Sequence, residues 1–215
     1  MPQHLTALKG SGLTLEAYVY LYFPLSPWNQ TPESRVQACI NMIRLADVPV
    51  GRIWLDVEVE GVPTDTAVNT IQALQRCESI IRGAGFEPGI YTSITMWTKM
   101  CANISAFNHL PLWDAHYLPA GSPQPPDMTG FRPYGGWTAA TMWQYQGTTE
   151  LCGHSVDLNV ALDVSVGTPD PLVQADAVIA VLKQINDYQL GVPFPPLDAV
   201  RKAVFSRVND LVQKQ

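Results

Sequence analysis

Hydrophobic residues in this chain fall into short runs separated by longer amphipathic stretches. Six runs of seven or eight residues are rich in aromatic and β-branched side chains, which is typical of strands. They are AYVYLYF (17–23), RIWLDVEV (52–59), EPGIYTS (87–93), LPLWDAHY (110–117), TMWQYQG (141–147) and SVDLNVAL (155–162). The pattern therefore predicts six strands, all within the first three quarters of the chain.

Amphipathic stretches follow the first two of these runs. Residues 32–45 and 64–84 repeat apolar side chains at helical spacing, and Thr64 is a good candidate for the N-cap of the second helix. Ser93 is expected to cap a shorter helix over residues 95–102. Because strands alternate with helices, we expect an α/β fold of parallel βα units, arranged as a doubly wound sheet or as a barrel.

The last part of the chain has a different pattern. Residues 168–215 lack strong strand runs and predict two amphipathic helices, over 171–190 and 197–212. Two prolines within residues 167–171 interrupt any regular element there, so this segment is expected to be a linker. The sequence thus predicts a main domain of residues 1–167 and a C-terminal helical hairpin that docks on it.

Composition narrows the class of protein. The chain has 215 residues, of which 47% are hydrophobic and 15% charged, so a compact globular core is expected. A net charge of −6 argues against a nucleic-acid partner, which needs a basic face, and against binding to anionic membranes. No run reaches the ~18 apolar residues of a membrane span, and no signal peptide is recognisable at the start.

Cysteines and histidines do not suggest a metal site. The cysteines are widely and irregularly spaced, without a CxxC pair, at Cys39, Cys77, Cys101 and Cys152. This spacing favours free thiols over a disulfide framework and disfavours zinc. His116 and His154 have no metal-like partners at suitable spacing, and they are expected to be structural or rim residues.

The most informative run alternates apolar and acidic residues just before Gly61. Because successive side chains of a strand point to opposite faces, this run predicts one apolar and one acidic face. The apolar face holds Ile53, Leu55, Val57 and Val59, and the other face holds Trp54, Asp56, Glu58 and Glu60. The apolar face can pack under helices, whereas the acidic face is hard to explain as core.

Asp56 and Glu58 are the candidate reactive pair. Two carboxylates at this spacing lie about 6–7 Å apart at their Cα atoms, and the proximity of like charges raises at least one pKa, as a general acid requires. The strand is expected to end at Gly61, which puts the acids at the carboxyl end, where α/β barrels carry their chemistry. Glu60 is expected to be a rim charge. The alternative is an edge strand with a solvated acidic face.

Five segments together resemble a known family, the glycoside hydrolase family 25 lysozymes. The segments occur in the family's order and cover roughly residues 15 to 165. They are WLDVE (54–58), GIYTS (89–93), LPLWDAHY (110–117), MWQYQG (142–147) and GHSVDLN (153–159). The resemblance implies a TIM-like barrel that hydrolyses the β-1,4 bond between N-acetylmuramic acid and N-acetylglucosamine in bacterial peptidoglycan. It implies action outside the cell and neither a metal nor an organic cofactor.

The resemblance also implies roles for individual residues. Glu58 matches the family's proposed acid, Asp56 its carboxylate partner and Asp157 the aspartate of its closing strand. The residues that fall where the family lines its sugar cleft are Tyr22, Tyr91, Trp113, Tyr117 and Gln144. Tyr18 and Trp143 are instead expected to fill the barrel.

The chain departs from the family pattern at its start. The family opens with a strand that bears a glycine, an aspartate and a serine, and nothing here matches it. We therefore expect an incomplete barrel of about six strands, with residues 17–23 and 155–162 at its edges. The C-terminal hairpin or a second copy of the chain would cover the gap. Without that aspartate, a non-catalytic glycan-binding or structural barrel remains the alternative function.

Overall fold

A computed structural model describes residues 15–23, 29–59, 65–119, 121–125, 127–151 and 154–161. Strands and helices alternate along the first half of the chain, as the hydrophobic pattern predicts. In chain order, the elements are β1 (Leu15–Tyr20), α2 (Pro32–Ala46), β2 (Val50–Asp56), α3 (Ala67–Gly83), β3 (Glu87–Thr92), α4 (Ile94–Cys101), β4 (Leu112–Ala115), β5 (Met142–Leu151) and β6 (His154–Ala161). The predicted C-terminal hairpin and the boundary at residue 168 lie outside the described residues.

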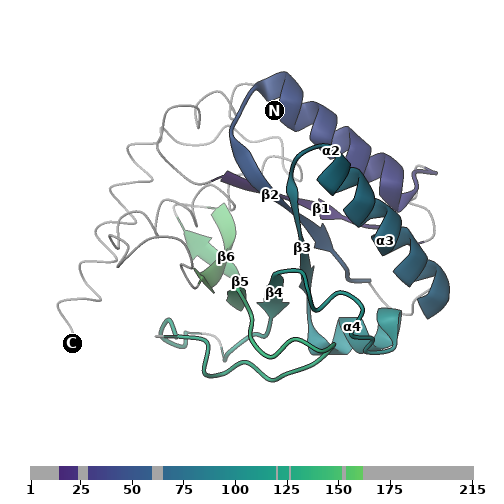
Figure 1. Cartoon of the computed structure of the whole chain (residues 1–215). Coiled ribbons are helices and arrows are strands. Elements are labelled where there is room, and N and C mark those ends of the chain that lie inside the picture. Colours follow the sequence, from purple (N-terminus) through teal and green to yellow (C-terminus); the bar gives the residue numbers. More distant parts are fainter. Residues whose placement is uncertain are drawn as a thin grey trace.

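The six strands form one curled sheet in the order β1-β2-β3-β4-β5-β6, which makes half of a barrel (Figure 1). The first five strands are parallel, whereas β6 runs antiparallel to β5. The expectation of mainly parallel strands is therefore confirmed, with β6 as the exception. Only two residues separate β5 from β6, and so short a connection makes a hairpin, since a parallel crossover needs a dozen residues or more.

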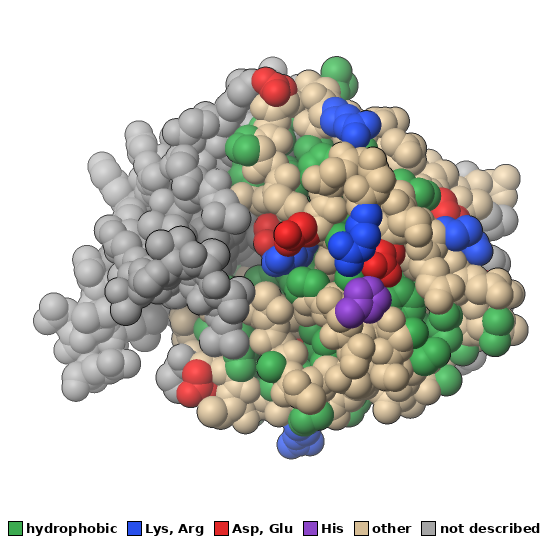
Figure 2. Space-filling view, viewed as in Figure 1, with side chains coloured by type: hydrophobic (Ala, Val, Ile, Leu, Met, Phe, Trp, Pro, Cys, Tyr) green, Lys and Arg blue, Asp and Glu red, His purple; other side chains and the backbone are tan. Residues whose placement is uncertain are grey.

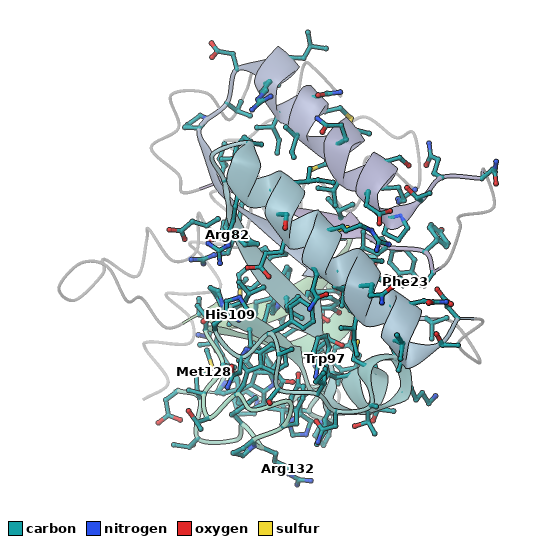
Figure 3. The ribbon with its side chains drawn as sticks, turned by 45° about the vertical axis from the view of Figure 1, so that its right-hand side comes forward. Phe23, Arg82, Trp97, His109, Met128 and Arg132 are labelled. Atoms are coloured by element: carbon teal, nitrogen blue, oxygen red, sulfur yellow. The ribbon has the colours of Figure 1, made fainter. Side chains whose placement is uncertain are left out.

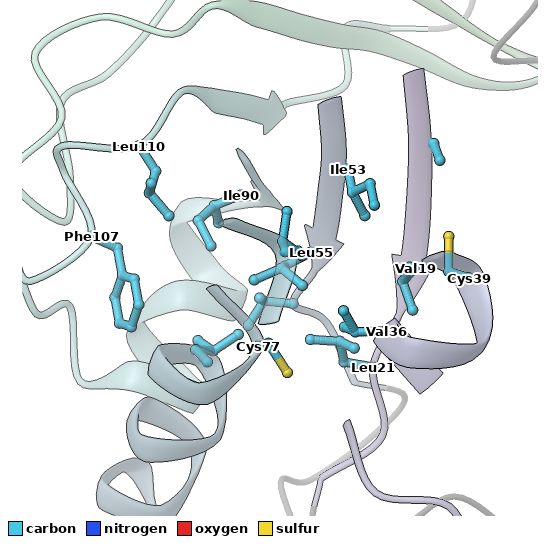
Figure 4. Close-up of a cluster of buried hydrophobic side chains, with 14 of the residues drawn as sticks. Val19, Leu21, Val36, Cys39, Ile53, Leu55, Cys77, Ile90, Phe107 and Leu110 are labelled. Atoms are coloured by element: carbon cyan, nitrogen blue, oxygen red, sulfur yellow. The ribbon is translucent and has the colours of Figure 1, made fainter. Parts of the chain in front are cut away.

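Helices α2 and α3 lie side by side over the outer face of the sheet, and α4 extends this layer (Figure 1). Between the helices and the strands lies the larger hydrophobic core (Figure 4). Val36 and Ile40 of α2 and Ile53 and Leu55 of β2 all belong to this core, and all four are fully buried. The predicted apolar stretches therefore supply this core, although Leu45 at the end of the first helical stretch is 85% exposed and Val68 in the second is 62% exposed.

Side-chain caps begin each helix. Ser93 caps α4, as predicted, by accepting a hydrogen bond from the Met96 backbone N–H at 3.2 Å. The prediction of Thr64 as the cap of α3 is wrong, because the Thr66 hydroxyl accepts from the Asn69 N–H at 3.2 Å instead. Two threonines two residues apart offer the same capping chemistry, and only the path of the chain into the helix selects between them.

A second, smaller core fills the inner face of the sheet. It consists of Trp54, Tyr91, Trp113 and Met142. Trp54 lies against Gly89 of the neighbouring strand, where any Cβ would come within 2.4 Å of the indole carbon Cε3. The indole N–H of Trp54 donates to Glu16 Oε2 at 2.7 Å. Glycine in β3 therefore lets an indole lie across the inner face of the sheet.

Three of the four cysteines are free thiols inside the fold, as the sequence predicts. Cys39, Cys77 and Cys101 are all buried. Burial raises the pKa of these thiols to about 11, 12 and 12, respectively. They are therefore protonated at neutral pH and serve as small apolar side chains of the core. Cys152 lies outside the described residues.

Charged side chains of both signs lie next to one another on the face covered by α3 (Figure 2). Among them, Arg82 and His109 (Figure 3) both contact Glu78 Oε1, at 2.9 and 3.0 Å. Positive and negative side chains on this face therefore pair with one another. No helix within the described residues is long and apolar enough to cross a membrane.

Candidate active site

The centre of the candidate site is the carboxyl end of β2. Asp56 is the last residue of this strand, and it pairs in register with Tyr20 of β1 and Tyr91 of β3. The hydrophobic pattern predicts a strand that continues to Gly61, but the sheet ladder stops at Asp56. Glu58 therefore lies in the segment that follows β2. It is half-buried and still close enough to act electrostatically on Asp56.

Asp56 sits in an environment that disfavours its charge. The residue is only 3% exposed, and its Oδ1 is buried without a hydrogen-bond partner among the described residues. Burial raises the pKa of the Asp56 carboxyl well above its ordinary value, and the neighbouring negative charge of Glu58 raises it further. The spacing predicts a raised pKa in this pair, but burial contributes more to it than the like charge does.

Gln144 on β5 joins three other predicted site residues. Its Oε1 accepts hydrogen bonds from the hydroxyls of Tyr91 at 2.7 Å and Tyr117 at 2.8 Å. Its Nε2 donates to Asp157 Oδ2 at 3.1 Å. Because Gln144 is 2% exposed, this amide is a buried centre that links β3, β5 and β6 with the segment after β4.

Asp157 on β6 receives a second hydrogen bond from β5. Its Oδ1 accepts from the backbone N–H of Thr148 at 2.9 Å. Burial raises the pKa of Asp157, and the Thr148 hydrogen bond partly lowers it. The pairing of β5 with β6 is irregular around Gln146, and Thr148 has a positive φ of 54°. This bulge in β5 directs the Thr148 N–H to the carboxylate.

The three carboxyl groups share a neighbourhood. Burial raises the pKa of the Tyr18 hydroxyl, and the charges of Asp56, Asp157 and Glu58 raise it further. The pKa of Tyr117 is also raised, first by burial and then by the same three charges, although a hydrogen bond with Tyr91 lowers it. The charges of Asp56, Glu58 and Asp157 therefore all act on the same two tyrosine hydroxyls, of which that of Tyr18 belongs to a residue packed against the inner core.

The aromatic residues that the resemblance assigns to sugar contact fall into two groups. Tyr117 is 56% exposed at the rim, and Tyr22 is half-buried beyond β1, with the Arg35 guanidinium 5.1 Å from its ring centre. Tyr91 and Trp113 are buried in the inner core, where their rings meet edge to face at 4.8 Å. Trp113 therefore offers no open face to a sugar ring in this structure, and it supports the residues above it.

Sequence reasoning misses two residues near the carboxylates. Tyr18 is expected to fill the barrel, but it is half-buried, and the charges of all three acids raise the pKa of its hydroxyl. Asn159 follows Asp157 on the same strand face, and its Oδ1 accepts the Trp113 indole N–H at 2.9 Å. The alternation of side chains along each strand could have indicated both residues. It places Tyr18 on the same face as Tyr20, and Asn159 on the same face as Asp157.

Other predictions from the sequence have simpler outcomes. Trp143 is buried, stacks on His116 and donates its indole N–H to the His116 carbonyl at 2.6 Å, so both residues are structural. Glu60 and the side chain of His154 lie outside the described residues.

Within the described part of the chain, no three His, Cys, Asp or Glu side chains are grouped so that they could hold a metal ion. The chemistry of this site is that of carboxyl groups, which can transfer protons and stabilise positive charge.

Comparisons with known proteins identify the relatives of this chain. A sequence profile of the family described as "Lysozyme-like protein 1" matches residues 2–145. The chain is 33% identical over 162 residues to "Probable GH family 25 lysozyme 3" of Dictyostelium discoideum. This match covers 74% of this chain and 32% of that protein. It is also 33% identical over 135 residues to "Counting factor 50" of the same organism, covering 61% of this chain and 42% of that protein.

A solved structure shows the same fold. The family GH25 lysozyme from Aspergillus fumigatus superposes with a TM-score of 0.53 at 19% identity, over 73% of this chain and 71% of that chain. The matched part of the chain spans 32% and 42% of the length of the two Dictyostelium relatives. The profile, the relatives and the curled sheet together show that the chain belongs to the glycoside hydrolase family 25 lysozyme-like proteins.

Proposed function

We propose that this chain is the catalytic part of a muramidase. It hydrolyses the β-1,4 bond between N-acetylmuramic acid and N-acetylglucosamine in bacterial peptidoglycan, and it acts on the wall outside the cell. The observation that carries the proposal is the pair of acids at the end of β2, in which buried Asp56 lies beside half-buried Glu58. A buried carboxyl with a raised pKa beside a second acid is a costly arrangement, and such pairs are concentrated at catalytic sites.

The proposed mechanism gives each acid a separate role. Glu58 protonates the oxygen of the leaving sugar, because it is the more accessible member of the pair. Asp56 and Asp157 orient the acetamido group of the substrate or stabilise the positive charge that develops on the sugar. Gln144 holds Asp157 in place through its amide nitrogen. Tyr22 and Tyr117 contact the glycan at the rim, and no metal or cofactor takes part.

A second candidate function is a non-catalytic glycan-binding or structural domain. The observation in its favour is that the relatives of this chain include a protein named for a counting factor as well as one named as a lysozyme. The chain also spans less than half of both relatives. Both candidates use the same rim and the same sugar polymer, but only the muramidase needs a proton donor at position 58.

The experiment that separates the two candidates is a turbidity assay of the purified chain on bacterial cell walls. We expect lysis by the native chain and none by Glu58→Gln, because the amide has nearly the same shape but cannot donate the proton. Glu150→Gln is the matched control, since Glu150 is exposed on β5, and it should retain full lysis. Binding to the walls without lysis by the native chain would support the non-catalytic function instead.

A further inference from the structure

The peptide that connects Val57 to Glu58 is held by a side chain of the neighbouring strand. The ladder of β2 ends at Asp56, but both backbone polar groups of Val57 still bond to β3. The Val57 N–H donates to the Tyr91 carbonyl at 2.9 Å. The hydroxyl of Thr92 donates to the Val57 carbonyl at 2.7 Å, and this bond is buried. Thr92 therefore replaces the backbone partner that a continuing strand would have supplied.

This bond bears directly on Glu58. The Val57 carbonyl and the Glu58 N–H belong to one planar peptide unit, so fixing the carbonyl direction fixes the plane. That plane and the φ angle of Glu58 together set the direction in which the Glu58 side chain leaves the backbone. Glu58 lies beyond the regular part of β2, and a residue in such a segment needs another restraint to keep a fixed geometry.

Thr92 is itself firmly placed. Its side chain is 0% exposed on the helix-facing side of β3, and the β-branched threonine has a stiff χ1 angle. Its backbone carbonyl lies 3.4 Å from the hydroxyl of Tyr134, which donates to Asp114 Oδ1 at 2.8 Å. Thr92 and Asp114 are register partners on β3 and β4. A buried polar group thus supports the end of β3 from the side opposite the candidate site.

We propose that Thr92 is a positioning residue for Glu58, acting through its hydrogen bond to the Val57 carbonyl. The inference deepens the proposed function, because it assumes that Glu58 is the proton donor. Thr92 does not touch the substrate from its position behind the sheet. Its effect is therefore on the rate of the chemical step, and not on the binding of the glycan.

The test compares Thr92→Val, which keeps the shape and removes the hydroxyl, with Thr92→Ser, which keeps the hydroxyl. On a soluble peptidoglycan oligosaccharide, we expect Thr92→Val to lower kcat by about 10- to 100-fold with KM nearly unchanged. Thr92→Ser should restore kcat to within about three-fold of the native value. Thr70→Val is the matched control, because Thr70 is also buried, at 2% exposure, but lies in α3 and not in the sheet, and its kcat should not change.

Several outcomes would overturn the proposal. An unchanged kcat in Thr92→Val, a loss confined to KM, or an equal loss in Thr92→Ser would each show that the hydroxyl does not position the acid. If Thr92→Val does not fold, as judged by near-ultraviolet circular dichroism, Thr92→Ala removes the hydroxyl without placing a second methyl group where the hydroxyl was. The same expectations and the same contrary results then apply to Thr92→Ala.

A second measurement keeps this inference separate from the proposed function. The carbonyl ¹³C signal of Val57 and the amide signal of Glu58 report the hydrogen bond without any substrate. We expect both signals to move in Thr92→Val and to stay near their native positions in Thr92→Ser. A native chain that does not lyse walls overturns the proposed function, whereas unmoved signals in Thr92→Val overturn the role of Thr92.

Discussion

The side chain of Gln144 donates a hydrogen bond to Asp157 at 3.1 Å while its oxygen accepts from two tyrosine hydroxyls. This arrangement fixes the orientation of the amide, because only the nitrogen end can donate to a carboxylate. It also makes the position of an acid on one strand depend on a side chain of the next, since Gln144 is on β5 and Asp157 is on β6.

Replacing the amide with an acid should break this arrangement. Gln144→Glu is nearly isosteric, but it removes the donor and sets a second carboxylate against Asp157. We expect a loss of wall lysis and a fall of about 1–3 kcal/mol in the free energy of unfolding at pH 7, measured with urea. Gln146→Glu, two residues along the same strand and half-buried, is the control. Similar losses from both changes would contradict a special role for Gln144.

Asp56 should make the folded protein less stable at neutral pH than an uncharged residue would. Its pKa is raised in the folded state by burial and by Glu58, so the folded state binds the proton more tightly than the unfolded state. The contribution of the protonated Asp56 carboxyl to the free energy of unfolding is therefore fully present below the unfolded pKa of about 3.9. This contribution is lost as the pH rises through the folded pKa. Asp56→Asn should raise the melting temperature at pH 7, and the gain should disappear in acid.

Thermal unfolding of both proteins between pH 3 and pH 8 checks this expectation. Asp127→Asn offers a control of opposite sign, because hydrogen bonds from Thr129 lower the pKa of the Asp127 carboxyl. Removing the Asp127 carboxylate should destabilise the protein slightly at pH values above the unfolded pKa, and it should have no effect in acid. An Asp56→Asn protein that melts lower than the native chain at pH 7 would show that the carboxylate has favourable contacts in the folded state.

Gly89 should tolerate no side chain. A Cβ there would lie 2.4 Å from Trp54 Cε3, so Gly89→Ala must displace a buried indole that also hydrogen bonds to Glu16. We expect a loss of about 1–3 kcal/mol in the free energy of unfolding. Gly51→Ala is the control, because a Cβ at Gly51 would meet nothing within 4 Å. Equal stability of the two variants in urea would mean that Trp54 moves aside at little cost.

The end strands of the described sheet lead to a prediction about the tail. β1 and β6 lie at the two ends of the strand order, as the sequence predicts, and uncovered strand edges promote aggregation. If the C-terminal segment covers an edge, deleting residues 170–215 should cause aggregation or loss of the folded state. Size-exclusion chromatography with thermal unfolding measures both. A truncated chain that is monomeric and melts at the native temperature would show that the segment is dispensable.

The sequence by itself determined the order of the elements and the two faces of β2. Trp54 and Asp56 point to one side of the sheet, and Ile53 and Leu55 point to the other, because alternation is a local property of any strand. The ordered motifs also identified the family correctly, since the spacing of the short runs reflects the fold.

Other features were decided by the tertiary structure alone. The end of β2 at Asp56, the burial of Asp56 and the hydrogen bonds of Gln144 all depend on strands that are far away along the chain. The hydrogen bond from the Thr92 hydroxyl to the Val57 carbonyl joins residues 35 positions apart, and no periodic pattern in the sequence indicates it. Periodicity reports which face a side chain occupies, whereas the depth and partners of that side chain depend on how the neighbouring strands curl and align.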